Sequence, residues 1–102
     1  MKNKNNRKNF KFPQDVLNMK SLCDYLLLNG VIESEEVYFA MLNTDRSDFI
    51  DPNYAYFDNS QSISYNSIIS APHMHAYPLE YLKDYLKPGK KVLDIGSGSG
   101  YL

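Results

Sequence analysis

Near the end of the chain stands the stretch Lys91-Val92-Leu93-Asp94-Ile95-Gly96-Ser97-Gly98-Ser99-Gly100-Tyr101. Its apolar start, Val92 to Ile95, predicts a buried strand, and three glycines at alternate positions follow directly. Glycine has no Cβ, so the backbone can turn tightly and approach a ligand closely. In open α/β sheets, ligands bind beyond the carboxyl ends of strands, where such turns lead into helices. The stretch therefore predicts an α/β fold and the opening of a nucleotide site.

The glycine spacing makes this interpretation more specific. The pattern from Asp94 to Gly100 is D-x-G-x-G-x-G, so its third glycine comes one residue earlier than in the G-x-G-x-x-G dinucleotide motif. Gly96 is expected to let a nucleoside or amino-acid moiety approach the backbone, and Asp94 to accept hydrogen bonds from loop amides or a ligand ammonium group. An ordinary Gly/Ser linker is disfavoured because strand-like residues precede the glycines. Only Leu102 follows Tyr101, so we expect the rest of the nucleotide site to lie outside these 102 residues.

Length and composition narrow the class of protein. A chain of 102 residues allows one small domain, and 43% hydrophobic and 14% aromatic residues are globular values. No apolar run approaches the roughly 20 residues of a membrane helix. The single cysteine, Cys23, excludes an internal disulfide and fits a reducing compartment. We therefore expect a cytoplasmic protein that makes no use of a membrane, with Cys23 as a packed core thiol.

Charge is distributed unevenly along the chain. The first eleven residues contain five bases and no acid: Lys2, Lys4, Arg7, Lys8 and Lys11. A basic arm can bind nucleic acid. Asparagines interleave these bases, however, and no aromatic residue appears before Phe10, so solvated disorder is the better interpretation. We predict a disordered tail over residues 1–18, a folded part over 19–102 and no nucleic-acid partner.

Two helices are expected after the tail. Apolar periodicity predicts the first over residues 19–29, and Asn29-Gly30 supplies a left-handed stop. Ser34 is a candidate N-cap for the second, with Glu35 and Glu36 in its first turn. The apolar face of this second helix is expected to comprise Val37, Ala40 and Met41.

Alternation and proline then mark the next elements. Residues 62–70 alternate polar and apolar side chains, which predicts a strand or extended segment with one wet face. Ala71-Pro72 is expected to open a third helix, because proline is tolerated in a first turn. Pro78 predicts a kink or a displaced start of this helix. Its expected buried stripe is Met74, Tyr81, Leu82 and Tyr85.

Polar side chains around this helix are candidates for chemistry. His73 and His75 are two apart, so they point to different sides of a helix and predict no metal site, although His75 could donate to a ligand. Ser70 is either the N-cap or a hydroxyl that orients a substrate. No G-x-S-x-G elbow supports a catalytic triad. The pair Asp45-Arg46 predicts a local salt bridge or loop brace, with a substrate-carboxylate contact as the less favoured alternative.

Several stretches together resemble one family. They are Met41-Leu42-Asn43-Thr44-Asp45-Arg46, Tyr56-Phe57-Asp58, Gln61-Ser62-Ile63, Ile69-Ser70-Ala71-Pro72-His73-Met74-His75-Ala76 and Asp94-Ile95-Gly96-Ser97-Gly98-Ser99-Gly100. In this order and spacing they resemble the N-terminal half of a protein-L-isoaspartate (D-aspartate) O-methyltransferase. The resemblance covers about residues 22–102, and the stretch from Ile69 to Ala76 is its most specific part.

The resemblance implies an activity and a fold. The activity is methyl transfer from S-adenosylmethionine to the free carboxylate of isoaspartyl residues, which initiates repair of damaged proteins. The partners would be proteins or peptides carrying such residues, and the full-length form would be a monomer. The fold would be the N-terminal part of a Rossmann-like methyltransferase with an N-terminal helical addition, truncated after the first parallel strand.

The resemblance also assigns roles to residues. Ser70 matches the family's proposed active-site serine, which would hold the acceptor carboxylate by a hydrogen bond. Matches to cofactor-lining positions are Ser67, Ile68, Ile69, Ser70, His75 and Ser99, to which the glycine turn adds Asp94 and Gly96. Ser60, Ser64 and Pro78 depart from the family pattern and affect local geometry more than chemistry.

Two other functions remain open from the sequence. One is a different Rossmann-like methyltransferase, because the glycine turn is shared by many enzymes that use S-adenosylmethionine. The other is a non-catalytic binding module that docks on a partner. For the methyltransferase that the resemblance implies, we expect residues 1–102 alone neither to bind the cofactor tightly nor to catalyse, because the acidic ribose ligand of such folds follows about 20 residues after the glycines.

Overall fold

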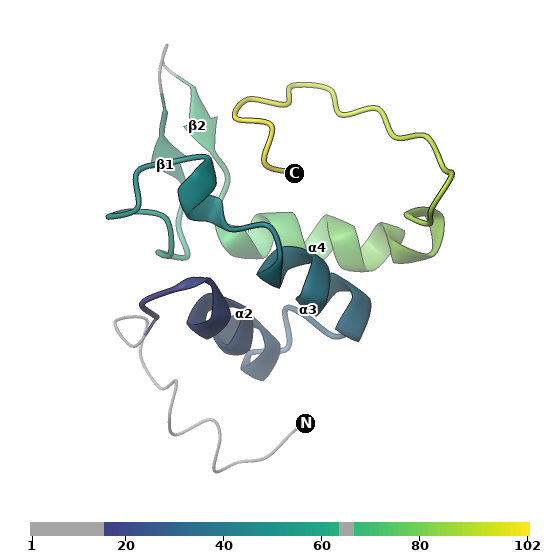
Figure 1. Ribbon diagram of the computed structural model, residues 1–102, viewed down its shortest axis with the longest axis horizontal. Helices are drawn as coiled ribbons and strands as arrows, with labels where there is room; N and C mark the ends of the chain where they lie inside the picture. The colour runs from purple at the N-terminus through teal and green to yellow at the C-terminus, as the bar shows by residue number, and fades with distance from the viewer. Residues whose placement is uncertain (1–15, 64–66) are drawn as a thin grey trace.

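The part of the chain that the structure describes comprises three α-helices, two short 3-10 helices, one β-hairpin and a long irregular C-terminal segment. The structure is a computed structural model, and it describes residues 16–63 and 67–102. The helices pack together, the hairpin lies at one end of them, and the C-terminal segment curves back over the last helix (Figure 1). The predicted tail lies outside the described residues up to residue 15, as does Ser64. Residues 16–18 belong to the folded part, because Val16 is buried in the core and Asn18 caps a helix.

Helix α2 (Met19–Leu28) begins and ends as local chemistry requires. Asn18 and Ser21 form a reciprocal capping box, in which the Asn18 side chain accepts from the Ser21 amide at 2.8 Å. At the other end, Gly30 has a φ of 75° and donates to the Leu27 carbonyl, while Val31 donates to Leu26. This is a Schellman ending, which confirms the predicted stop at Asn29-Gly30.

Helix α3 (Glu35–Leu42) starts at Ser34, as expected, and is tied to a distant helix at that end. The Glu80 carboxylate accepts hydrogen bonds from the amides of Glu33 and Ser34 and from the Ser34 hydroxyl. Val37 and Met41 are buried, whereas Ala40 is exposed, so the predicted apolar face is wrong at that residue. Glu80 belongs to the third helix, so these hydrogen bonds tie that helix to the start of α3.

The alternating segment forms a hairpin and not one strand. Strand β1 (Gln61–Ser62) pairs antiparallel with β2 (Ile68–Ile69), and Gln61 lies opposite Ile69. The Ile63 amide donates to the Ser67 carbonyl, which extends the antiparallel pairing by one residue on each strand. Ile69 is buried and Ile68 is exposed, so one face of β2 is dry and the other is open.

Helix α4 (Pro72–Leu82) begins at the predicted proline and runs through Pro78, which excludes the displaced start. Its buried side chains are Pro72, His75 and Ala76. The predicted stripe of Met74, Tyr81, Leu82 and Tyr85 is wrong, because all four are at least half exposed. The prediction failed because it assigned the inner face of α4 from apolar side chains, whereas the polar residue His75 lies on that face. A short 3-10 helix, η3 (Lys83–Tyr85), follows.

The C-terminal segment differs most from the prediction. After the turn at Pro88-Gly89, the chain passes back along α4, and its end lies near the hairpin (Figure 1). The expected strand is absent: Val92 and Leu93 have no regular structure, Ile95 lies in a turn, and the three side chains are 70–86% exposed. A strand needs a neighbour to pair with its backbone groups. Within the described residues the only sheet is β1–β2, so the first parallel strand is not formed.

The core lies between α2, α3 and the inner face of α4. Its buried members are Val16, Met19, Leu22, Cys23, Leu26, Ile32, Val37, Met41 and Ala76. Cys23 is a core thiol, as predicted, and burial raises its pKa to about 12. Among the residues in 16–63 and 67–102, no helix has the length and apolar character needed to cross a membrane.

Candidate functional site

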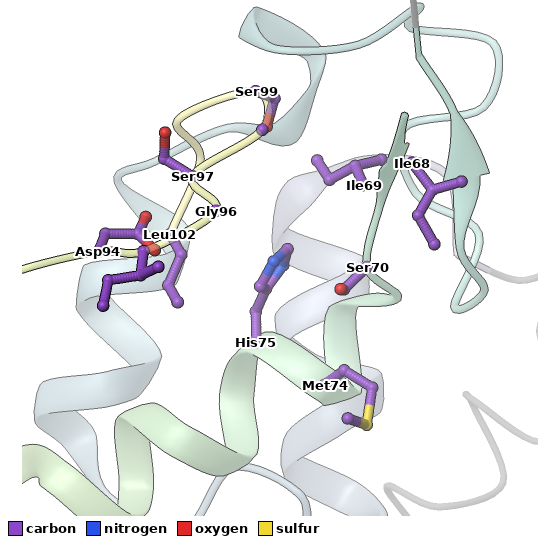
Figure 2. Close-up of a pocket in the computed structure, with 12 residues that line it drawn as sticks. Ile68, Ile69, Ser70, Met74, His75, Asp94, Gly96, Ser97, Ser99 and Leu102 are labelled. Atoms are coloured by element: carbon purple, nitrogen blue, oxygen red, sulfur yellow. The ribbon is translucent and has the colours of Figure 1, made fainter. Parts of the chain in front are cut away.

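A pocket of about 230 Å³ lies between the first turn of α4, next to the hairpin, and the glycine turn, which comprises residues 94–100. Two separate segments of the chain form its walls (Figure 2). One wall is β2 with the first turn of α4, and the other is the returning C-terminal segment. The lining residues are Ile68, Ile69, Ser70, Met74, His75, Asp94, Ile95, Gly96, Ser97, Gly98, Ser99 and Leu102.

The first wall is built where β2 passes into α4. Ala71, and not Ser70, is the N-cap of α4, so the capping interpretation of Ser70 is wrong. The Ser70 hydroxyl instead lines the pocket (Figure 2). His75, one turn into α4, stands between Ser70 and the glycine turn in the same view.

The second wall is a folded turn of small residues. Gly96, Gly98 and Gly100 have φ values of 75°, 56° and 82°, which is the left-handed region that side chains disfavour. The Gly100 amide donates to the Ser97 carbonyl at 2.8 Å, which closes the turn. A Cβ on Gly98 would lie 3.8 Å from the Ile68 carbonyl oxygen, so the two walls approach each other there.

The structure brings most of the sequence-predicted site residues together. Seven of the eight line this pocket: Ile68, Ile69, Ser70, His75, Asp94, Gly96 and Ser99. Ser67 is the exception, because it is exposed and its carbonyl accepts from the Ile63 amide within the hairpin. Proximity supports a common site for the seven residues, whereas their individual roles stay predictions.

A buried cluster beneath the pocket was not foreseen. Arg46, from the 3-10 helix η2 (Arg46–Asp48), is completely buried and contacts Ser70, His75 and Tyr101. The predicted salt bridge with Asp45 is not formed, whereas the predicted loop brace is confirmed, because Arg46 donates to the carbonyls of Ala55 and Ser70. Arg46 does not line the pocket, which disfavours the substrate-carboxylate contact. Asp45 instead accepts from the Ser47 amide and the Tyr56 hydroxyl. The stretch from Met41 to Arg46 carries part of the family resemblance, but it does not predict that Arg46 is buried, because the burial depends on long-range packing.

Tyr101 anchors the glycine turn on this cluster. Its ring centre lies 5.0 Å from that of His75, 5.3 Å from that of Phe49 and 5.1 Å from the Arg46 guanidinium carbon. Burial raises the pKa of the Tyr101 hydroxyl to about 12, against the opposing effect of Arg46. The hydroxyl has no hydrogen-bond partner among the described residues. Its ring contacts thus hold the second wall against the first.

His75 is kept neutral by its surroundings. It is 8% exposed, and its Nδ1 lies 3.1 Å from Arg46 Nη1. Burial, and then the charge of Arg46, lower the pKa of His75 to about 4, while Asp94 opposes them. Asp94 is the one acidic side chain among the pocket-lining residues.

Acidification is expected to destabilise the fold through His75. Its folded pKa of about 4 lies below the 6.5 of an unperturbed imidazole, so between these values only the unfolded chain takes up the proton. The contribution is present above pH 6.5 and is lost as pH falls towards 4. It should amount to roughly 1–3 kcal/mol in the free energy of unfolding. Urea titrations at several pH values would measure it. Equal pH dependence in wild type and His75→Gln would contradict the assignment.

The second histidine has a different environment, as the spacing predicts. His73 Nδ1 lies 2.8 Å from the Asp58 carboxylate, which also accepts from the His73 amide at 3.0 Å. His73 therefore fastens the start of α4 to the preceding loop. Within the part of the chain that the structure describes, no three metal-ligating side chains gather in one place.

Comparison with known proteins adds independent evidence. Residues 17–102 match the family model described as protein-L-isoaspartate(D-aspartate) O-methyltransferase. Protein-L-isoaspartate O-methyltransferase 1 of Arabidopsis thaliana is 47% identical over 96 residues, covering 93% of this chain and 42% of that protein. The Caenorhabditis elegans protein-L-isoaspartate O-methyltransferase is 52% identical over 81 residues, covering 79% of this chain and 36% of that protein. The chain thus spans about two fifths of the length of these relatives.

A solved structure shows the same arrangement of the chain. It is the crystal structure of a protein-L-isoaspartate O-methyltransferase from Plasmodium falciparum in complex with S-adenosyl-L-homocysteine. The TM-score is 0.79 at 46% sequence identity, and the match covers 82% of this chain and 38% of that one.

Proposed function

Because the chain belongs to the protein-L-isoaspartate (D-aspartate) O-methyltransferase family, we propose that the full-length protein methylates damaged proteins. The methyl group would pass from S-adenosylmethionine to the free carboxylate of L-isoaspartyl and D-aspartyl residues. The observation that carries this proposal is the shared pocket, where the β2–α4 wall faces the glycine turn. Family membership disfavours an unrelated Rossmann-like methyltransferase.

The pocket residues fit the cofactor chemically. S-adenosylmethionine carries a sulfonium and an ammonium group, and Asp94 places a carboxylate at the rim (Figure 2). Gly96 and Gly98 lack the Cβ atoms that would keep a ligand away from the backbone. The volume of about 230 Å³ is below the roughly 300–1,000 Å³ of complete ligand sites. We infer that these residues form part of the site and that the remaining part of the full-length protein completes it.

The proposed reaction needs alignment more than acid–base catalysis. When bound, S-adenosylmethionine supplies an activated methyl group, so that an oxygen–carbon bond forms as the carbon–sulfur bond breaks and a neutral thioether leaves. The acceptor carboxylate has an ordinary pKa near 4 and is already ionised at neutral pH. The protein's contribution is to orient the carboxylate and exclude water, which can lower a barrier by roughly 7–11 kcal/mol.

Ser70 and His75 are the side chains placed to orient the acceptor. Ser70 presents a hydroxyl donor from the first wall. His75 is neutral, and its Nδ1 is occupied by Arg46, so it offers a hydrogen-bond donor and no strong base. We propose that Ser70 is the catalytic residue and binds the carboxylate. The proposed cofactor contacts comprise Ile68, Ile69, Ser70, His75, Asp94, Gly96 and Ser99.

Replacing Ser70 with alanine in the full-length protein should lower kcat/KM for an isoaspartyl peptide roughly 10- to 100-fold, the usual value of a hydrogen bond to a charged group. Affinity for S-adenosylmethionine should fall by a smaller factor, because the other six proposed contacts to the cofactor remain. Ser62→Ala, in the exposed part of β1, is the matched control. Unchanged turnover and peptide affinity in Ser70→Ala would contradict this role.

The activity itself is tested by methyl transfer to paired peptides. One peptide carries an isoaspartyl residue and the other carries ordinary aspartate at the same position. The full-length protein should transfer labelled methyl groups to the first and not to the second. Equal labelling of both, or of neither, would overturn the proposed function.

For residues 1–102 alone we propose neither tight cofactor binding nor catalysis, because the pocket is small and open. Calorimetry with S-adenosylmethionine would test this, and micromolar affinity would contradict it.

We further propose that the full-length protein is monomeric, binds no nucleic acid or membrane and works in the cytoplasm. The single buried thiol, Cys23, supports a reducing compartment.

A further inference from the structure

Arg46 is a buried cation without an acidic partner. It is fully buried, and no carboxylate in the described part of the chain lies within 4.0 Å of its nitrogens. A buried guanidinium stays protonated, and an unpaired buried charge is costly unless hydrogen bonds compensate it. Arg46 does not line the pocket, so its effect on a ligand must act through its neighbours.

Each of the three guanidinium nitrogens contacts a different residue. Nε donates to the Ala55 carbonyl at 3.0 Å, in the loop before the hairpin. Nη2 donates to the Ser70 carbonyl at 3.0 Å, and Nη1 lies 3.1 Å from His75 Nδ1. Because the guanidinium is planar and rigid, these three contacts fix the relative positions of their segments.

The contact with His75 also determines where the imidazole proton sits. Arginine can only donate, so His75 Nδ1 must accept, and the ring proton must lie on Nε2. The charged and titratable groups facing His75 are Arg46 from η2, Asp94 from the glycine segment and Tyr101 behind that segment. Arg46 and burial both favour the neutral ring, and together they outweigh Asp94.

Tyr101 connects the same guanidinium to the second wall. Its ring packs over Arg46 and against His75, directly after the glycine turn. Arg46 therefore contacts the first wall through the Ser70 backbone and the His75 side chain, and it contacts the second wall through Tyr101.

We propose that Arg46 is a positioning residue of the methyl-transfer site, which sets Ser70 and the Nε2–H form of His75 in place and joins the two walls through Tyr101. This inference rests on the proposed function for its catalytic consequence. Its structural part, the control of His75, does not.

Two variants of the full-length protein separate the charge of Arg46 from its shape. Arg46→Met removes both and should raise the titration midpoint of His75, followed by nuclear magnetic resonance of the ring, by at least about one pH unit. Arg46→Lys keeps the positive charge, so it should keep the low titration midpoint of His75. Its single ammonium group cannot reach all three acceptors, however. Both should lower kcat/KM for an isoaspartyl peptide about 10- to 100-fold, as expected for misplaced groups. Lys20→Met, on the surface of α2, removes one positive charge as the control.

The outcomes distinguish this inference from the proposed function. A wild-type protein without isoaspartyl transfer would overturn the proposed function, while the midpoint of His75 would still decide whether Arg46 controls it. An unchanged midpoint in Arg46→Met would overturn the inference. Full kcat/KM in Arg46→Lys would also overturn it, and this variant decides the question if Arg46→Met does not fold.

Discussion

Replacing Gly96 with valine is expected to weaken binding of S-adenosylmethionine to the full-length protein by at least about 100-fold, or about 2.7 kcal/mol. Gly96 lines the pocket and has a φ of 75°, a conformation that a β-branched residue avoids. Valine would therefore either distort the turn or leave the left-handed region, and in both cases the second wall would move. Calorimetric titration with S-adenosyl-L-homocysteine measures the loss without turnover.

Gly89→Val is the matched control for this experiment. Gly89 has a φ of 85°, lies in the same C-terminal segment and is equally free of neighbours within 4 Å of an added Cβ, but it does not line the pocket. Valine there should impose similar backbone strain and leave cofactor affinity within about twofold of wild type. Equal losses of affinity in the two variants would show that strain in the segment, and not the pocket wall, accounts for the effect.

Replacing Leu22 with alanine should lower the free energy of unfolding by about 2–5 kcal/mol. Leu22 is completely buried between α2 and its neighbours, and the cavity left by truncation cannot close without moving helices. Such a loss is a large part of the 5–15 kcal/mol typical of a small domain. Urea titration followed by circular dichroism measures it.

Leu17→Ala is the control for the core variant, because Leu17 is 76% exposed just before the same helix. Its effect should stay within about 0.5 kcal/mol. A loss below about 1 kcal/mol in Leu22→Ala, or equal losses in both variants, would contradict the placement of the core.

Local signals in the sequence predicted the elements whose ends are set by local chemistry. Asn29-Gly30 and Ser34 sit at helix ends where their own side chains or φ values satisfy backbone groups, and both were predicted. Pro72 opens α4 for another local reason, because a proline has no N–H that the first turn would leave unpaired. These helix ends depend only on neighbours within a few residues, so they can be predicted from one sequence.

Features that depend on long-range packing were missed. Val92 to Ile95 has the composition of a strand, but pairing requires another segment that the described residues do not provide. The face of α4 was assigned from apolar side chains, whereas the buried Arg46 makes His75 the inner residue. The pocket was predicted in part because family resemblance located both walls, while Arg46 and Tyr101 behind it carry no local signal of burial.

The structure of the full-length protein with S-adenosyl-L-homocysteine tests the central claim most directly. We expect the ligand to touch both walls at once: Ile68 to His75 on one side and Asp94 to Ser99 on the other. A ligand bound by only one of these segments, or in another cavity, would contradict the account.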